Sequence, residues 1–235
     1  QLVPMLEEVS VTGRTEQARQ RLLGWDYVMD KNSVEAGIYA AWEAELRRTV
    51  RDAIVPAGSD MNLSLSKVIE TVMVPPGTLG SDPMRARDGL LISALEDAVT
   101  ALEEKLGSDM SGWLYGQADY HHAYLRHPMG TAVDPSTRAV LEAGPLSRGG
   151  YGSTVNQTGN GDNQTSGASF RIIIDTGDWD RAVGMNTPGQ SGDTRSPFYD
   201  NLFEFWANDQ FHPVFYSRDK IEEVTARRIE LRPGR

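Results

Sequence analysis

The sequence predicts an α+β fold, with a mainly helical part at residues 1–107 and strands, loops and C-terminal helices at residues 108–235. In the first part, apolar residues recur every three or four positions, the period of a helix with one buried face. After about residue 108, aromatic residues, histidine, glycine and proline interrupt that period, and short β-branched runs appear. We interpret the boundary as a change of layer and expect residues 1–235 to form a single domain.

Apolar faces predict the first two helices. The first helix has four apolar residues at spacings of four, three and four, although Gly24 weakens the pattern: Ala18, Leu22, Trp25 and Met29. Asn32 followed by Glu35 has the spacing of a capping box, in which side chains satisfy the free N–H groups of a helix start. The helix that this box opens carries a second apolar face: Tyr39, Trp42, Leu46 and Val50.

Two further helices complete the N-terminal part. The third is short, ends at Pro75-Pro76-Gly77 and has one apolar set: Leu65, Val68, Ile69 and Val72. The fourth has the clearest period: Leu91, Leu95, Ala98, Leu102 and Leu106. Gly107 is expected just past its end, where a left-handed backbone conformation favours glycine. The acidic residues Glu43, Glu45, Glu103 and Glu104 are expected on solvated helix faces.

The C-terminal part begins with a polar tract, Arg148 to Gly167, which is typical of a loop. Phe170 to Ile174 is nearly all apolar and predicts a strand buried on both faces. Ala182 to Met185 is its expected partner, joined to it by a hairpin-like connection at Thr176 to Asp180.

Shorter elements are expected after this hairpin. Ser196-Pro197 predicts a helix start with proline in the first turn, and the helix would bury Leu202, Phe203 and Trp206. Three elements follow in order: a strand at Val214 to Tyr216, a helix capped by Ser217 that carries Ile221 and Val224, and a closing strand with Ile229 and Leu231.

The composition excludes several classes of function. A net charge of −10 argues against nucleic-acid binding, which needs a basic surface. The absence of cysteine rules out disulfides, thiol nucleophiles and cysteine-ligated metals. No apolar run approaches the length of a membrane span. The chain opens at Gln1 without an initiator methionine or a signal-peptide pattern, so we expect it to be processed or cut from a longer protein.

Some residues suggest chemistry that the local pattern does not support. His121, His122 and His127, with Asp119, could be metal ligands, but no known zinc motif accompanies them, and we expect them to shape a loop. Ser64 and Lys67 match a serine-x-x-lysine pattern without its companion motifs, and we expect a solvated helix start. Ser191 lies in a glycine-rich turn that lacks the setting of a nucleophile elbow.

Five short motifs in order resemble the penicillin amidase family of N-terminal-nucleophile acylases, near the C-terminal end of its sequences. The motifs are Trp113-Leu114-Tyr115-Gly116 with His127-Pro128-Met129, Gly152-Ser153-Thr154-Val155-Asn156, Ala168-Ser169-Phe170-Arg171 with Asp175, Gly189-Gln190-Ser191-Gly192, and Ser196-Pro197-Phe198-Tyr199. Their order and spacing make the resemblance specific. Phe198 departs from it, because the family commonly has histidine there, so no polar role is carried over to this position.

The resemblance implies a four-layer αββα fold, of which this chain would be a piece from the C-terminal portion of the β chain. Family members cut themselves into an α and a β chain. The β chain begins with a serine that attacks the amide carbonyl, with its own α-amino group as base. A backbone N–H and an asparagine form the oxyanion hole, and many members bind calcium. These groups belong to earlier segments, so we expect no catalytic residue and no metal ligand in this chain.

The function expected from the resemblance is therefore that of one part of an acylase that hydrolyses a linear amide through an acyl-enzyme. Asn156, Gln190 and Ser191 are candidates for supporting the substrate site. The expected partners are the α chain, the N-terminal part of the β chain and a small acyl-amide substrate, in the periplasm or outside the cell. The chain alone is expected to be inactive and to self-associate through open sheet edges. The acyl specificity stays open.

Two alternatives to this function remain. One is a stand-alone, non-catalytic α+β binding or structural module built on a related scaffold. The other is a metal-dependent hydrolase that uses His121, His122 and His127.

Overall fold

The structure is a computed structural model that describes residues 1–159, 161–164 and 166–233. Asn160 and Thr165, in the predicted loop, lie outside the described residues. The α-helices are α1 (Gly13–Leu23), α2 (Val34–Ile54), α3 (Leu65–Met73), α4 (Pro83–Leu106), α5 (Pro135–Leu141), α6 (Phe203–Ala207) and α7 (Arg218–Glu223). The 3₁₀ helices are η1 (Val3–Glu8), η2 (Gly77–Leu79), η3 (Met110–Gly112) and η4 (Trp179–Arg181). The strands are β1 (His122–Leu125), β2 (Ala143–Ser147), β3 (Arg171–Ile173), β4 (Val183–Met185) and β5 (His212–Pro213).

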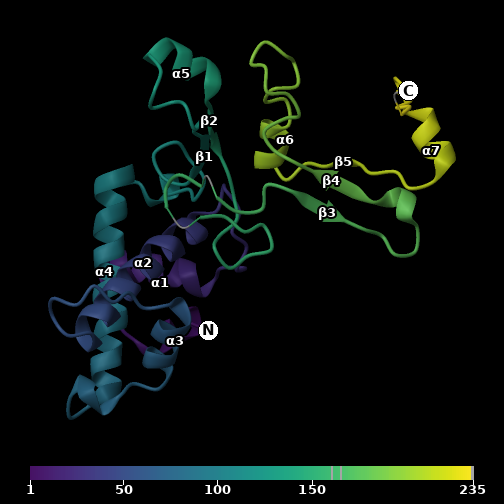
Figure 1. The fold of residues 1–235 in the computed structure, drawn as a ribbon. Helices are drawn as coiled ribbons and strands as arrows, with labels where there is room; N and C mark the ends of the chain where they lie inside the picture. The colour runs from purple at the N-terminus through teal and green to yellow at the C-terminus, as the bar shows by residue number, and fades with distance from the viewer. Residues whose placement is uncertain (160, 165, 234–235) are drawn as a thin grey trace.

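The α+β prediction is confirmed: helices α1 to α4 form one body, and two small antiparallel sheets follow it (Figure 1). The long helices α2 and α4 pack along each other, with α1 and α3 against them. Trp42 of α2 is fully buried, and its indole N–H donates to the carbonyl of Leu91 in α4 at 3.3 Å. No helix in the described part of the chain combines the length and the apolar composition of a membrane span.

Helix ends differ from the sequence prediction at two places. The first helix ends at Leu23, because Gly24 follows as its cap, so Trp25 and Met29 belong to an irregular segment beyond it. The second helix is capped by Ser33, whose side chain accepts from the N–H of Ala36 at 3.0 Å. The predicted capping box at Asn32 is therefore wrong by one residue.

Glu43 is the main correction in the helical body, because it is only 1% exposed. One oxygen of its carboxylate accepts from Arg47 at 2.8 Å and from the Tyr151 hydroxyl at 3.1 Å. Burial, followed by the charge of Glu43, raises the pKa of Tyr151. Glu43 lies four residues after Tyr39 and three before Leu46, so the helical period places it on the apolar face of α2, and the Tyr151 segment covers that position.

The C-terminal sheet has the strand order β3–β4–β5, with both pairs antiparallel. The predicted pairing of Phe170–Ile174 with Ala182–Met185 is confirmed, because Ile172 lies opposite Gly184. The predicted burial of the first strand is wrong, since Ile172 and Ile173 are 44% and 58% exposed. No layer in the described part of the chain covers these side chains.

The remaining short elements are confirmed in part. Ser217 caps α7 as predicted, accepting from the N–H of Lys220. Phe203 and Trp206 are buried, but their helix begins at Phe203 and not at Ser196-Pro197. The strand predicted at Val214 is shifted to β5, and the strand predicted at Ile229 and Leu231 has no regular structure. Strands β1 and β2 and helix α5 were not foreseen.

Two glycines in helix interiors provide a matched test of the packing around α2. A Cβ on Gly37 would lie 2.4 Å from the carbonyl oxygen of Trp113, whereas a Cβ on Gly89 would meet nothing within 4 Å. We expect Gly37→Ala to destabilise the fold by about 1–3 kcal/mol through overpacking. Gly89→Ala should stabilise it by about 0.5–1 kcal/mol through helix propensity. Urea unfolding measures both values, and stabilisation by Gly37→Ala would contradict the close approach of these elements.

Candidate functional site

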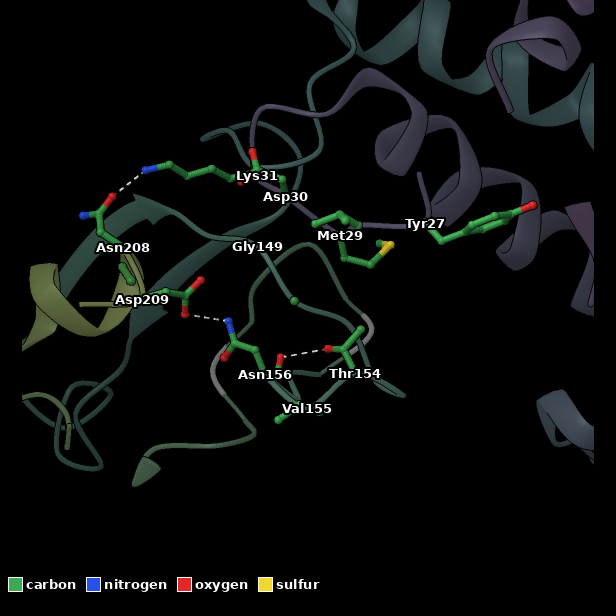
Figure 2. A pocket seen from close by; sticks show the side chains of 13 residues that line it. Tyr27, Met29, Asp30, Lys31, Gly149, Thr154, Val155, Asn156, Asn208 and Asp209 are labelled. Carbon is green, nitrogen blue, oxygen red and sulfur yellow. Dashed lines mark hydrogen bonds between the residues drawn. The ribbon is translucent and has the colours of Figure 1, made fainter. Parts of the chain in front are cut away.

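A cavity of about 430 Å³ lies where the helical body meets the C-terminal part (Figure 2). Its walls come from four segments that are far apart in the sequence: residues 27–31, 149–150, 154–156 and 207–209. It is the point at which the segment after α1, the loop after β2 and the end of α6 converge. Of the three candidate residues, it contains Asn156.

The wall at residues 27–31 is an irregular segment, in which Tyr27 has a left-handed backbone conformation, and local hydrogen bonds fix it. The carboxylates of Asp26 and Asp30 accept from the backbone N–H groups two residues later, at 2.9 and 2.7 Å. Gly150 N–H donates to the carbonyl of Met29 at 2.9 Å. A Cβ on Gly149 would lie 2.6 Å from that same carbonyl oxygen, so only glycine allows the two segments to approach this closely.

The wall at residues 154–156 is a turn that is stabilised by hydrogen bonds of the Thr154 hydroxyl. The hydroxyl of Thr154 accepts from the N–H of Tyr151 at 2.8 Å and bonds the carbonyl of Asn156 at 3.0 Å. Val155, between the two bonded residues, is fully exposed. The turn therefore presents the apolar side chain of Val155 at the cavity, while the side chains of Thr154 and Asn156 are hydrogen-bonded within the protein.

Beneath this turn lies an arginine–tryptophan cluster, formed by Arg148, Asn156, Arg171, Trp206 and Asp209. The guanidinium of Arg148 lies 3.8 Å from the centre of the Trp206 ring, and that of Arg171 lies 5.7 Å from it. Both arginines donate to the side-chain oxygen of Asn156, at 2.8 and 3.4 Å. The Asn156 amide donates to Asp209 at 2.9 Å, and Arg171 forms an ion pair with the same carboxylate.

The electrostatics of this cluster are dominated by a buried positive charge. Arg148 is fully buried, and burial, together with the nearby charge of Arg171, lowers its pKa to about 10. Its Nε and Nη1 atoms have no hydrogen-bond partner among the described residues. Contact with the Trp206 ring and the charge of Asp209 offset part of the desolvation, because a cation is attracted to the face of an indole.

The structure does not bring the three candidate residues together. The side chain of Asn156 lines the cavity but is occupied by Arg148, Arg171 and Asp209, so it organises the wall. Gln190 and Ser191 lie in a separate turn, where both N–H groups donate to the carbonyl of Phe198. A substrate contact by Gln190 or Ser191 therefore stays a prediction.

The serine candidates are engaged in local capping. The Ser191 hydroxyl accepts from the N–H of Asp193 at 3.1 Å. Ser64 caps α3, accepting from the N–H of Lys67 at 3.2 Å, while the Lys67 ammonium pairs with Glu70 at 3.0 Å. The Ser64–Lys67 pattern is thus a helix start, as expected from the sequence.

The histidines do not converge. His121 is buried between the rings of Tyr115 and Tyr120, with ring centres 4.3 and 4.2 Å away. His127 accepts from the N–H of Met129, two residues along the chain. No group of three His, Cys, Asp or Glu side chains that could hold a metal is found in the described residues. The metal site considered for His121, His122 and His127 is therefore not found among the described residues.

Sequence reasoning missed the residues that build the cluster. Arg148 precedes two glycines in a stretch that we interpreted as a loop, and Arg171 interrupts an apolar run. A charged residue inside a predicted buried strand was the available signal, because such a charge needs a partner. The partner Asp209 lies 38 residues away, and no local pattern connects them.

Comparisons with known proteins agree on one family. The family model described as penicillin amidase matches residues 1–223. The chain is 29% identical to penicillin acylase 2 proenzyme of a Pseudomonas species (strain SE83), over 97% of this chain and 30% of that protein. It is 23% identical to the acyl-homoserine lactone acylase QuiP of Pseudomonas aeruginosa, over 94% of this chain and 29% of that protein.

A solved structure shows the same fold. It is a thermostable penicillin G acylase from Alcaligenes faecalis, which matches with a TM-score of 0.52 and 17% identity. The match covers 99% of this chain and 46% of the acylase chain. This chain therefore spans about 30% of the length of the two curated relatives and just under half of the solved chain.

The arginine–tryptophan cluster can be tested with two tryptophans of opposite exposure. Trp206 is 3% exposed and contacts both arginines, whereas Trp179 is 52% exposed. We expect Trp206→Leu to lower the free energy of unfolding by about 3 kcal/mol, since it removes ring burial and cation–π contacts. Trp179→Leu should lower it by about 1 kcal/mol or less. Urea unfolding followed by circular dichroism compares them, and equal losses would refute a stabilising role for the cluster.

Stability should fall with acid through His121. Burial lowers its pKa from 6.5 to about 4, so the unfolded chain binds the proton more readily between these values. Above pH 6.5 the His121 side chain is neutral in both states and the free energy of unfolding is not reduced. As the pH falls from 6.5 toward 4, protonation of the unfolded chain lowers the free energy of unfolding by about 3 kcal/mol in total. His121→Phe, which keeps the ring stacking, should flatten this part of the pH profile of unfolding. His212→Phe is the exposed control, and an identical profile for both variants would contradict the assignment.

Proposed function

The chain belongs to the penicillin amidase family, and we propose that it forms the C-terminal part of the β chain of an acylase that hydrolyses a linear acyl-amide bond. The observation that carries this proposal is the family match over residues 1–223, together with the 30% of a penicillin acylase proenzyme that the chain spans. On this proposal the remaining segments of the longer protein supply the nucleophile, and this chain supplies scaffold.

The proposed reaction follows the chemistry of an N-terminal serine. The serine oxygen attacks the amide carbonyl, its α-amino group takes the hydroxyl proton, and the amine leaves with that proton. Water then cleaves the acyl-enzyme ester, releasing the carboxylic acid and restoring the serine. The relatives' names include a penicillin acylase and an acyl-homoserine lactone acylase, so the shared chemistry is an acyl group on an amine.

The local chemistry of Ser64 and Ser191 supports a nucleophile located elsewhere. Ser64 caps a helix, and its neighbouring lysine is neutralised by Glu70. Ser191 is engaged with the N–H of Asp193 in a turn. Neither serine has a base within hydrogen-bond distance in these contacts, which an activated serine needs.

An activity assay that compares the 235-residue chain with the longer polypeptide tests this proposal. With a phenylacetyl or fatty-acyl amide, the 235-residue chain should show no turnover, whereas the longer polypeptide should release the amine. In the longer polypeptide, Ser64→Ala should leave kcat unchanged, and Ser191→Ala should still form the acyl-enzyme, detected as a mass increase on the β chain. Replacement of the serine that opens the β chain should abolish both signals.

Other results would overturn the proposal. Turnover by the 235-residue chain would show that its own residues perform the chemistry. A reading frame that encodes only this chain would favour the stand-alone module. Cell fractionation tests the periplasmic or extracellular location that the family resemblance implies.

A further inference from the structure

We propose that the cavity at residues 27–31, 149–150, 154–156 and 207–209 binds a small amphipathic carboxylate, an acid anion with an apolar body, and that Lys31 pairs with its charge. The inference rests on the proposed function in one respect, because the acid released by the proposed reaction belongs to this class. Three features of the cavity support it: the apolar lining, the charge of Lys31 and the backbone conformation of the walls.

The cavity has the size and the lining of a small-molecule site. Its volume of about 430 Å³ lies within the range of roughly 300–1,000 Å³ that is typical of ligand pockets. Two valines line it with exposed side chains, since Val28 is 54% exposed and Val155 is fully exposed. Ligand pockets combine such apolar surface with a few polar groups that orient the ligand. An apolar ligand body would cover these valines, and a polar group is needed to orient it.

Lys31 supplies that polar group, and it differs from the other lysines of the chain in its partner. Three of the four lysines form ion pairs with carboxylates: Lys67, Lys105 and Lys220. The Lys31 side chain extends along the cavity, and its ammonium donates to the amide oxygen of Asn208 (Figure 2). It forms no ion pair with the described residues. An ammonium has three N–H groups, so two remain beside the one that Asn208 accepts.

The charges around the cavity favour an anion over a cation. Three cations lie at its walls or in the cluster beneath them, against two carboxylates: Lys31, Arg148 and Arg171, and Asp30 and Asp209. Asp209 is already paired with Arg171, and two nitrogens of the buried Arg148 have no partner among the described residues. One positive charge is therefore in excess here, in a chain whose net charge is −10. A carboxylate would balance this excess, whereas an amine would increase it.

The backbone of two wall residues is strained. Among the described residues other than glycine, those with a positive φ are Tyr27, at 64°, and Asp209, at 54°, and both line the cavity. Such conformations cost free energy and cluster at ligand sites. The backbone at Lys31 is fixed as well, because its carbonyl accepts from the N–H of Gly116 at 2.7 Å. Walls that are ordered before a ligand arrives lower the entropic cost of binding.

The test is calorimetric titration of the longer polypeptide with octanoate, and with octylamine as a probe of similar length and opposite charge. We expect octanoate to bind and octylamine to bind more weakly. Lys31→Met keeps the apolar stem but removes a charged donor, so it should weaken octanoate binding on the order of tenfold. Val155→Asp, at a fully exposed position, should weaken it by like-charge repulsion. Lys67→Met is the matched control and should leave the affinity unchanged, because Lys67 pairs with Glu70 in α3.

Three results would overturn the inference: no octanoate binding, equal octanoate affinity in the Lys31 and Lys67 variants, or tighter binding of octylamine than of octanoate. Circular dichroism checks that each variant keeps its fold. Release of the amine from an acyl-amide would still support the proposed function in those cases. Conversely, octanoate binding that depends on Lys31, in a longer polypeptide that releases no amine, would count against the proposed function alone.

Discussion

The contact between the helical body and the C-terminal part depends on one constraint, the buried guanidinium of Arg148. A charge removed from water is unfavourable unless aromatic, amide or carboxylate groups replace the solvent. Trp206 and Asn156 contact it directly, and Asp209 adds a negative charge nearby that also pairs with Arg171, whose like charge opposes that of Arg148. These groups come from the loop after β2, the start of β3 and the end of α6. The contacts that offset part of the desolvation of this one charge therefore come from segments far apart in the sequence.

The cavity follows from this junction. The residues after Arg148 are glycines that lie against the irregular segment at Met29, and Asn156 and Asp209 belong to both the cluster and the cavity wall. An asparagine bonded on its oxygen and on its nitrogen has little freedom to bind anything else. The cavity therefore has a rigid wall at Asn156.

The two hydrophobic clusters differ greatly in size, and the C-terminal one buries few residues. The helical body encloses a large core that includes Trp42, Leu46 and Leu95, whereas the C-terminal cluster is small and centred on Met185, Phe203 and Trp206. Apolar side chains of β3 remain outside both clusters. A strand of this composition is ordinarily covered on both faces, and this one is not covered by the described residues.

The sequence by itself determined the elements that depend on neighbours within a few residues. The periods of α2, α3 and α4, the cap at Ser217 and the pairing of β3 with β4 follow from side chains close along the chain, and five motifs were enough to indicate the family. Only the tertiary structure decided the burial of Glu43, the partners of Arg148 and Asn156, and the exposure of Ile172 and Ile173. These depend on which distant segment covers a surface. A helical or strand period specifies a face but not the segment that packs against it.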